Sequence, residues 1–215
     1  MIHALLFDLD GVLCDLMALH EEAFLAAVRV EGHFDLGAIE HRAHYAGRST
    51  KQKLQMLVDI GLITQQQVSP IAQAKQRLTQ TYVEQQVHPL TDRIALLRHF
   101  QTAGYGLGCV TNCIKSTAFD VLNRAGLLPF VERCVITNED AQPKPSPEPY
   151  QKACGLLETA PNEALVFEDH EVGLAAAKAA GCLTQHVPTY GWLSIESVWE
   201  AIEGAEMVQK MHTSS

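Results

Sequence analysis

Four stretches of the sequence place chemically capable side chains directly after apolar runs. They are, in chain order, Asp8 and Asp10 within LLFDLDGVLCD, Thr111–Asn112, Lys144 within QPKPSP, and Glu168–Asp169. Residues i and i+2 of an extended chain point to the same side, so Asp8 and Asp10 are expected to face one pocket. Two neighbouring carboxylates repel each other unless a cation or a proton lies between them.

This set of groups suits phosphoryl transfer at a hard cation. The two acidic pairs would form an oxygen-rich site, and Mg²⁺ prefers carboxylates, water and phosphate oxygens. Lys144 and the Thr111 hydroxyl can neutralise and hold an anionic group, and such positioning supplies most of the catalysis of phosphoryl transfer. One aspartate can act as a covalent nucleophile, and the other can protonate the leaving oxygen and later deprotonate water.

The elements that would position these residues alternate between strands and helices. The expected strands are 2–8, 107–111, 133–137, 164–167 and 183–187, and the expected helices are 91–103, 116–125, 147–157, 170–180 and one around 195–202. This alternation predicts an α/β fold with a doubly wound parallel sheet. Ligands of such sheets bind beyond the carboxyl ends of the strands, which is where the polar residues fall. The tail after Glu206 is polar and is expected to fray.

Residues 16–87 have a different, all-helical pattern. Apolar residues recur at spacings of three and four from Leu16 to Val30 and predict a helix that ends near Gly32. Ser49 and Gln52 form a capping-box pattern before a second helix. Ser69–Pro70 fits an N-cap followed by the first helical position and predicts a third helix from there to about residue 86.

The predicted organisation is therefore an α/β core of residues 1–15 and 88–215 with a helical domain, 16–87, inserted after the first strand. Inserted domains of this kind often open and close over a site.

The composition argues against two kinds of binding partner. The chain has 215 residues, of which 47% are hydrophobic, and its formal net charge is −9. The acidic excess argues against a nucleic-acid or anionic-membrane partner, either of which needs a basic patch. The sequence shows no membrane-spanning run, no signal peptide and no CxxC pair among its six cysteines, so we expect a cytoplasmic protein with buried free thiols.

At the polar residues the sequence resembles the haloacid dehalogenase (HAD) superfamily. FDLDGV resembles its first motif, DxDGx[TV], Thr111–Asn112 the second, Lys144 the third, and EDHEVG at 168–173 the fourth, typically EDSxxG. All four occur in the family's order. The insertion between the first and second motifs resembles the family's helical C1 cap.

The resemblance implies a role for each of these residues. Asp8 would be the nucleophile that forms an aspartyl-phosphate, and Asp10 the general acid and base. Thr111, Asn112 and Lys144 would bind the phosphoryl group of the substrate, with Lys144 also orienting Asp8. Magnesium would be held by Asp8, the main-chain carbonyl of Asp10, and Asp169, with Glu168 assisting directly or through water.

Within the superfamily the chain resembles the β-phosphoglucomutase-like group of phosphatases and mutases. The resemblance rests on DLDGV, Asp15, His20 and the cap loop Gly47-Arg48-Ser49. It implies that His20 and Arg48 contact the substrate. Three positions depart from the group: Leu16 replaces Thr or Ser, His170 replaces the Ser of the fourth motif, and Thr50 stands where the mutases carry an arginine for a second phosphate.

The predicted function is a magnesium-dependent phosphatase. Its substrate would be a small phosphate monoester, such as a sugar phosphate or a similar metabolite. A phosphosugar mutase uses the same residues and stays an alternative, and a non-catalytic binding protein on a HAD scaffold is a further one. A dehalogenase is disfavoured, because those enzymes lack an acid/base aspartate at the position of Asp10. We expect a monomer, since a C1-capped core needs no partner chain.

Overall fold

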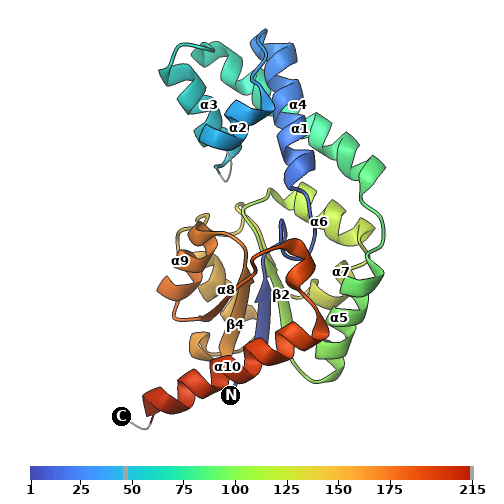
Figure 1. Cartoon of the computed structure of the whole chain (residues 1–215), viewed down its shortest axis with the longest axis vertical. Coiled ribbons are helices and arrows are strands. Elements are labelled where there is room, and N and C mark those ends of the chain that lie inside the picture. The colour runs from blue at the N-terminus through green and yellow to red at the C-terminus, as the bar shows by residue number, and fades with distance from the viewer. Residues whose placement is uncertain (46–47, 214–215) are drawn as a thin grey trace. The chain divides into compact units, whose positions relative to one another are not determined.

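The structure is a computed structural model that describes residues 1–45 and 48–213. The chain forms two compact units, which we call the core unit (Met1–Asp15 with His88–Ser215) and the helical unit (Leu16–Val87). Figure 1 shows strands and helices in the first unit and helices in the second. None of the helices in the described residues is long and apolar enough to cross a bilayer.

The core unit is built on a five-stranded parallel sheet. Its strands are β1 (Ala4–Phe7), β2 (Gly106–Val110), β3 (Val135–Ile136), β4 (Ala164–Glu168) and β5 (Leu183–His186), in the order β3-β2-β1-β4-β5. All pairings are parallel, and Phe7 at the end of β1 lies opposite Cys109 and Phe167. The central strand β1 is fully buried, which explains its uninterrupted apolar sequence. The predicted α/β fold with a parallel sheet is confirmed.

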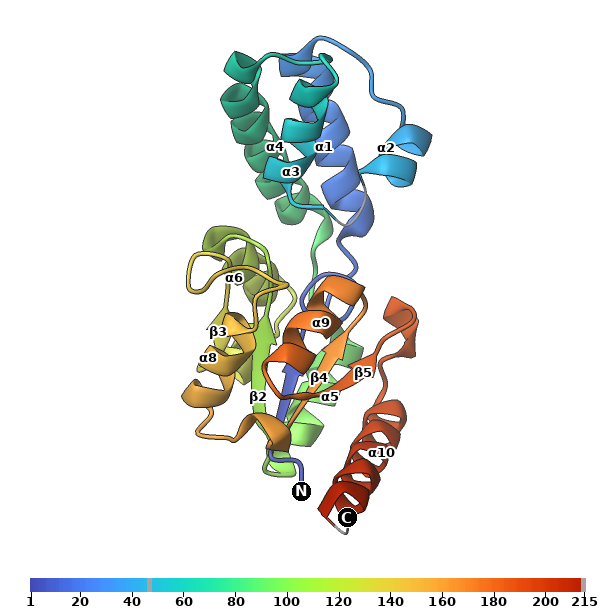
Figure 2. The ribbon, with the colours of Figure 1, turned by 90° about the vertical axis from the view of Figure 1, so that its left-hand side faces the viewer.

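Helices cover both faces of this sheet. They are α5 (Thr91–Thr102), α6 (Lys115–Arg124), α7 (Leu128–Val131), α8 (Glu148–Leu156), α9 (Glu171–Ala179) and α10 (Ile195–Thr213), with short 3₁₀ turns η1 (Pro161–Glu163) and η2 (Tyr190–Trp192). Figure 2 shows α9 in front of the sheet and α5 behind it. Helices α8 and α9 pack on alternate residues of β1, β2 and β4, such as Leu6, Val110 and Val166.

The helical unit contains α1 (Met17–Gly32), α2 (Ala38–His44), α3 (Thr50–Asp59) and α4 (Gln65–Gln86). Its core joins apolar residues of α1, α3 and α4, for example Phe24, Leu57 and Ile71, with Leu36 and Tyr45, which flank α2. The capping box before α3 forms as predicted: the Gln52 N–H donates to Ser49 Oγ at 3.2 Å, and the Ser49 N–H donates to Gln52 Oε1 at 3.0 Å. Residues 16–45 and 48–87 contain no strand.

Several predicted boundaries were wrong. Helix α4 begins at Gln65 and not after Ser69, because Gln67 Oε1 accepts the Thr64 N–H at 2.8 Å and starts the helix earlier; Pro70 then lies inside it. The tail does not fray at Glu206, since α10 continues to Thr213. The helices α2 and α7 were not predicted, because each is too short to show an apolar period.

Candidate active site

The first polar residue after β1 is held at the carboxyl edge of the sheet. The Asp8 N–H donates to the carbonyl of Phe167 at 3.0 Å, so Asp8 continues the pairing with β4. The chain then reverses, with the Gly11 N–H donating to the Cys14 carbonyl at 2.7 Å. Gly11 has φ +85°, and a Cβ there would lie 2.3 Å from Asp169 Oδ2, so only glycine fits both the backbone conformation and the space.

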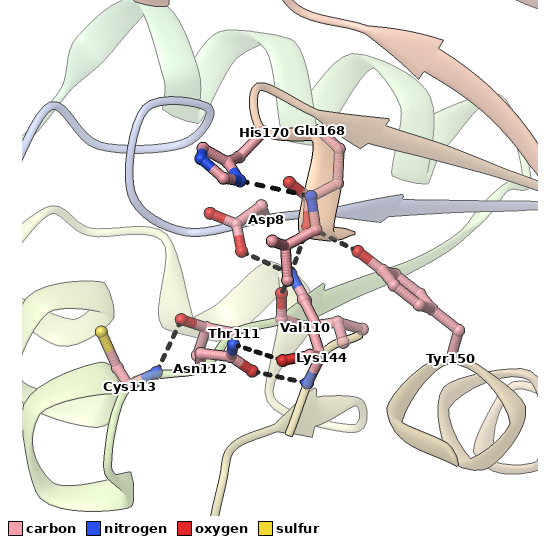
Figure 3. A network of polar contacts seen from close by, with 10 residues as sticks. Asp8, Val110, Thr111, Asn112, Cys113, Lys144, Tyr150, Glu168 and His170 are labelled. Carbon is pink, nitrogen blue, oxygen red and sulfur yellow. Dashed lines mark hydrogen bonds and ion pairs between the residues drawn. The ribbon is translucent and has the colours of Figure 1, made fainter. Parts of the chain in front are cut away.

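Lys144 lies at the centre of a buried polar network (Figure 3). Its Nζ donates to Asp8 Oδ1 at 2.6 Å, to the Val110 carbonyl at 2.7 Å, and to Glu168 Oε1. Lys144 is 7% exposed and Glu168 2% exposed, so these bonds act where water screens little. All three donors of the ammonium are therefore used within the protein.

Asn112 holds the backbone of the segment that carries Lys144. The Lys144 N–H donates to Asn112 Oδ1 at 2.9 Å, and Asn112 Nδ2 donates to the Lys144 carbonyl at 3.2 Å. The structure thus gives the Asn112 amide a supporting place in the site, beside its predicted contact with substrate. Figure 3 shows both bonds.

Thr111 follows β2 and is buried at the same edge. Its N–H donates to the Ile136 carbonyl at 2.9 Å, and its Oγ1 accepts the Cys113 N–H at 3.1 Å. A hydroxyl oxygen that accepts such a bond still carries a proton that it can donate. Thr111 can therefore offer a donor to an anionic ligand.

Three carboxylates gather beside Lys144. Asp8, Glu168 and Asp169 each place an oxygen within 4.8 Å of the others. Asp10, the fourth predicted metal residue, is half-buried and its side chain is not part of this group in the described chain. Three carboxylates and one ammonium leave an excess of two negative charges, and a divalent cation would balance that excess.

Burial and neighbouring charge shift the acid–base equilibria of the site. Burial raises the pKa of Asp8 to about 8, in spite of the opposing effect of Lys144. Burial also raises the pKa of Asp169, and the charge of Glu168 adds to that rise. Burial alone would lower the pKa of Lys144, but the negative charges around it, chiefly that of Asp8, raise it well above its usual range. Asp8 and Asp169 thus have too little positive charge nearby to offset the effect of their burial, and a bound cation would supply it.

Two residues of the site escaped the sequence reasoning. Tyr150 of α8 is fully buried, and its Oη donates to Glu168 Oε1 at 2.8 Å. Gly173 leaves space for the same carboxylate, because a Cβ there would lie 1.9 Å from Glu168 Oε1. The Gly of the fourth motif was a signal for the second contact, whereas no local pattern marks Tyr150.

His170 explains one departure from the family pattern. The Val172 N–H donates to His170 Nδ1 at 3.2 Å, so the imidazole caps the start of α9. A serine hydroxyl can supply the same acceptor. The substitution of His for Ser therefore keeps the helix that follows Asp169 in place.

The predicted substrate contacts of the insertion belong to the helical unit. His20 Nδ1 lies 3.4 Å from Lys75 Nζ, and burial, with the charges of Lys75 and Lys53, lowers the pKa of His20 to about 3. Lys53 Nζ lies 3.1 Å from Nε2 of His41, whose pKa is also lowered by burial. Two lysines thus pair with neutral imidazoles. Arg48 is exposed, and the neighbouring Gly47 lies outside the described residues.

Known proteins resemble this chain in sequence and in fold. The family model described as "Haloacid dehalogenase-like hydrolase" matches residues 5–187. A phosphoglycolate phosphatase of Cupriavidus necator is 40% identical over 86 residues, which are 39% of this chain and 37% of that protein, so the match spans less than two fifths of the relative's length. A pyrophosphatase, PpaX, of Bacillus thuringiensis is 27% identical over 98% of this chain and 93% of its own.

A solved structure shows the same fold. The β-phosphoglucomutase of Clostridium difficile superimposes with a TM-score of 0.76 at 19% identity, covering 96% of this chain and 100% of that one. At that identity the likeness is one of fold only. The family model, which spans most of the sequence and all four motifs, decides the assignment: the chain belongs to the haloacid dehalogenase-like hydrolase family.

Proposed function

We propose that this chain is a magnesium-dependent phosphatase that hydrolyses a small phosphate monoester through an aspartyl-phosphate. The observation that carries the proposal is the group of three carboxylates, Asp8, Glu168 and Asp169, within 4.8 Å of one another beside the buried Lys144 ammonium. The phosphatase names of the relatives from Cupriavidus necator and Bacillus thuringiensis support the same class of reaction.

The reaction would consist of two successive displacements at phosphorus. A carboxylate oxygen of Asp8 attacks phosphorus, and the leaving alkoxide takes a proton from Asp10. Asp10 then removes a proton from water, the water oxygen attacks the aspartyl-phosphate, and the P–O bond to Asp8 breaks. Inorganic phosphate leaves and both aspartates return to their starting state.

The remaining groups would hold the charge that moves in these steps. Lys144 keeps Asp8 in one orientation through its bond to Oδ1. Lys144 and Thr111 are the residues that we propose to bind phosphoryl oxygens, with Lys144 exchanging one of its protein acceptors for the phosphoryl group. Asp8, Asp169 and the Asp10 carbonyl would hold Mg²⁺, with Glu168 assisting. The cation supplies neutralisation of the phosphoryl charge when bound.

The helical unit would select the substrate. His20 and Arg48 are the residues that we propose for contact with the part of the ester beyond its phosphate, and the positive charges of Lys53 and Lys75 beside His20 suit an anionic or polar substituent. The fold likeness to a β-phosphoglucomutase at 19% identity does not favour a mutase, and Thr50 stands where a mutase would carry arginine. We propose a monomer in the cytoplasm, and size-exclusion chromatography of the purified chain tests the first part.

The decisive experiment measures phosphate release from a panel of phosphate monoesters with and without Mg²⁺. We expect metal-dependent release that Asp8→Asn abolishes, because an amide oxygen is a poor nucleophile. Asp120→Asn, which removes a surface carboxylate paired with Arg124, is the matched control and should keep full activity. Release that persists in Asp8→Asn would refute the aspartyl-phosphate route. Conversion of β-glucose 1-phosphate to the 6-phosphate without release would favour the mutase.

A second experiment addresses the helical unit. Arg48→Ala should raise KM for the best ester of the panel and leave KM for a generic aryl phosphate unchanged. Arg29→Ala removes another exposed arginine of the same unit and serves as the control. Equal KM values for wild type and Arg48→Ala on the best ester would exclude Arg48 as a substrate contact.

A further inference from the structure

Tyr150 brings a hydroxyl into an otherwise apolar cluster. The residue lies on α8 among alanine, valine and cysteine side chains of the helices and of the sheet, such as Ala153 of α8 and Val166 of β4. Its exposed fraction is 0%, and phenylalanine would fill the same volume. Burying a phenol without a partner is costly, so the hydroxyl at this position needs an acceptor, and Glu168 Oε1 at 2.8 Å supplies it.

That oxygen is shared with Lys144. Both Tyr150 Oη and Lys144 Nζ donate to Glu168 Oε1, and Lys144 Nζ also lies 5.2 Å from the centre of the Tyr150 ring. The same ammonium donates to Asp8 Oδ1 at 2.6 Å. The carboxylates of Glu168 and Asp8 therefore share the single ammonium of Lys144. The Tyr150 hydroxyl supplies Glu168 Oε1 with a second hydrogen-bond donor.

The Glu168 carboxylate is confined on its other side as well. A Cβ on Gly173 would lie 1.9 Å from Oε1 and 2.4 Å from Oε2, so the helix backbone of α9 lies directly against both oxygens. Glu168 Oε1 accepts bonds from both Tyr150 and Lys144 (Figure 3). Because the carboxylate also packs against α9, these contacts set the orientation of Oε2.

We propose that Tyr150 is a positioning residue of the active site. Its hydroxyl holds the Glu168 carboxylate so that Oε2 is left for the magnesium ion, and so that the Lys144 ammonium keeps its bond to Asp8. Removal of the hydroxyl leaves Oε1 with Lys144 as its donor. The ammonium then shifts toward Glu168 and away from Asp8, and the carboxylate is free to rotate. The kinetic part of this inference rests on the proposed phosphatase function, whereas the part on cation binding does not.

The test is Tyr150→Phe, which keeps the ring and removes the hydroxyl alone. A hydrogen bond to a charged group corresponds to a factor of about ten or more, so kcat should fall about tenfold with KM for the ester unchanged within about twofold. Isothermal titration calorimetry with MgCl₂ should show a dissociation constant raised by about threefold to tenfold. Tyr105→Phe is the control, because Tyr105 precedes β2 at the opposite edge of the sheet and packs against Phe100 and Trp199.

The outcomes separate positioning from simple packing. If Tyr150→Phe lowers the melting temperature while kcat and the magnesium dissociation constant stay within about twofold of wild type, the hydroxyl serves core stability only and the proposal is wrong. If the wild type releases phosphate from no ester, the proposed function fails, and the calorimetric comparison still decides whether Tyr150 positions Glu168 for a cation.

Discussion

Gly173→Ala should destabilise the core unit even though it replaces glycine in a helix. In an exposed helix interior this change stabilises by up to about 1 kcal/mol. At Gly173 the added Cβ would lie 1.9 Å from Glu168 Oε1 and 2.0 Å from its Cδ, so the carboxylate must move by about 1.5 Å to reach ordinary contact. The same oxygen receives the bonds from Lys144 and Tyr150, and this displacement weakens both.

The magnitude follows from those two bonds. Each hydrogen bond to a charged group contributes about 1.5–3 kcal/mol, so partial loss of both, set against the gain in helix propensity, predicts a net loss of about 2–4 kcal/mol in the free energy of unfolding. Gly204→Ala is the matched control. Gly204 is exposed in the middle of α10 and has no atom within 4 Å of its Cβ position, so that variant should be as stable as wild type or more so.

Urea unfolding without metal, followed by tryptophan fluorescence, measures this prediction. Both tryptophans, Trp192 and Trp199, lie in the core unit, so the signal reports the unit that carries the change. Gly173→Ala on a Glu168→Ala background should cost almost nothing, since the clashing carboxylate is gone. A Gly173→Ala protein as stable as wild type, or an equal loss on both backgrounds, would refute the steric argument.

Three further predictions concern acid–base linkage and the helical unit. The pKa of Asp8 is raised from 3.8 to about 8, so between these pH values the metal-free folded state binds more protons than the unfolded chain. The free energy of unfolding should therefore fall as the pH rises through this range. Urea unfolding at several pH values should show a smaller pH dependence for Asp8→Asn, and an unchanged dependence would contradict the prediction. Ser49→Ala removes the acceptor of the Gln52 N–H and should cost about 1 kcal/mol in a far-ultraviolet circular dichroism melt, whereas an unaltered melt would mean that water replaces the cap. Pro70→Ala restores an amide N–H inside α4 and should stabilise the helical unit by about 2 kcal/mol. This value is the cost of proline in a helix interior less the entropy that proline removes from the unfolded chain. A lower melting temperature of the variant would contradict the prediction.

Local sequence signals predicted the elements whose cause is local. The apolar run before Asp8 is a buried central strand, and the Ser49–Gln52 pair is a capping box, because both depend on residues adjacent in the chain. Ser69–Pro70 is also a local signal, and it predicted the wrong start for α4. The pair is typical of a helix start, but Gln67 already accepts the Thr64 N–H, and α4 continues through the exposed Pro70 with the next residue, Ile71, buried.

The gathering of the four motifs also follows from the sequence, because polar residues at the carboxyl ends of parallel strands must share one edge of the sheet. What each side chain does there was decided by tertiary structure. Lys144 and Asp8 are 136 positions apart, and their contact depends on the pairing of β1 with β2 and on the loop that Asn112 holds. Tyr150 and Gly173 enter the site from helices. The sequence shows Tyr150 as an ordinary aromatic, and it marks Gly173 as part of the fourth motif without showing which carboxylate the glycine faces. The sequence alone therefore determined which chemical groups reach the edge of the sheet, whereas packing of α8 and α9 against it decided which carboxylate oxygens are taken and which remain for a ligand, since that outcome depends on distances between distant segments.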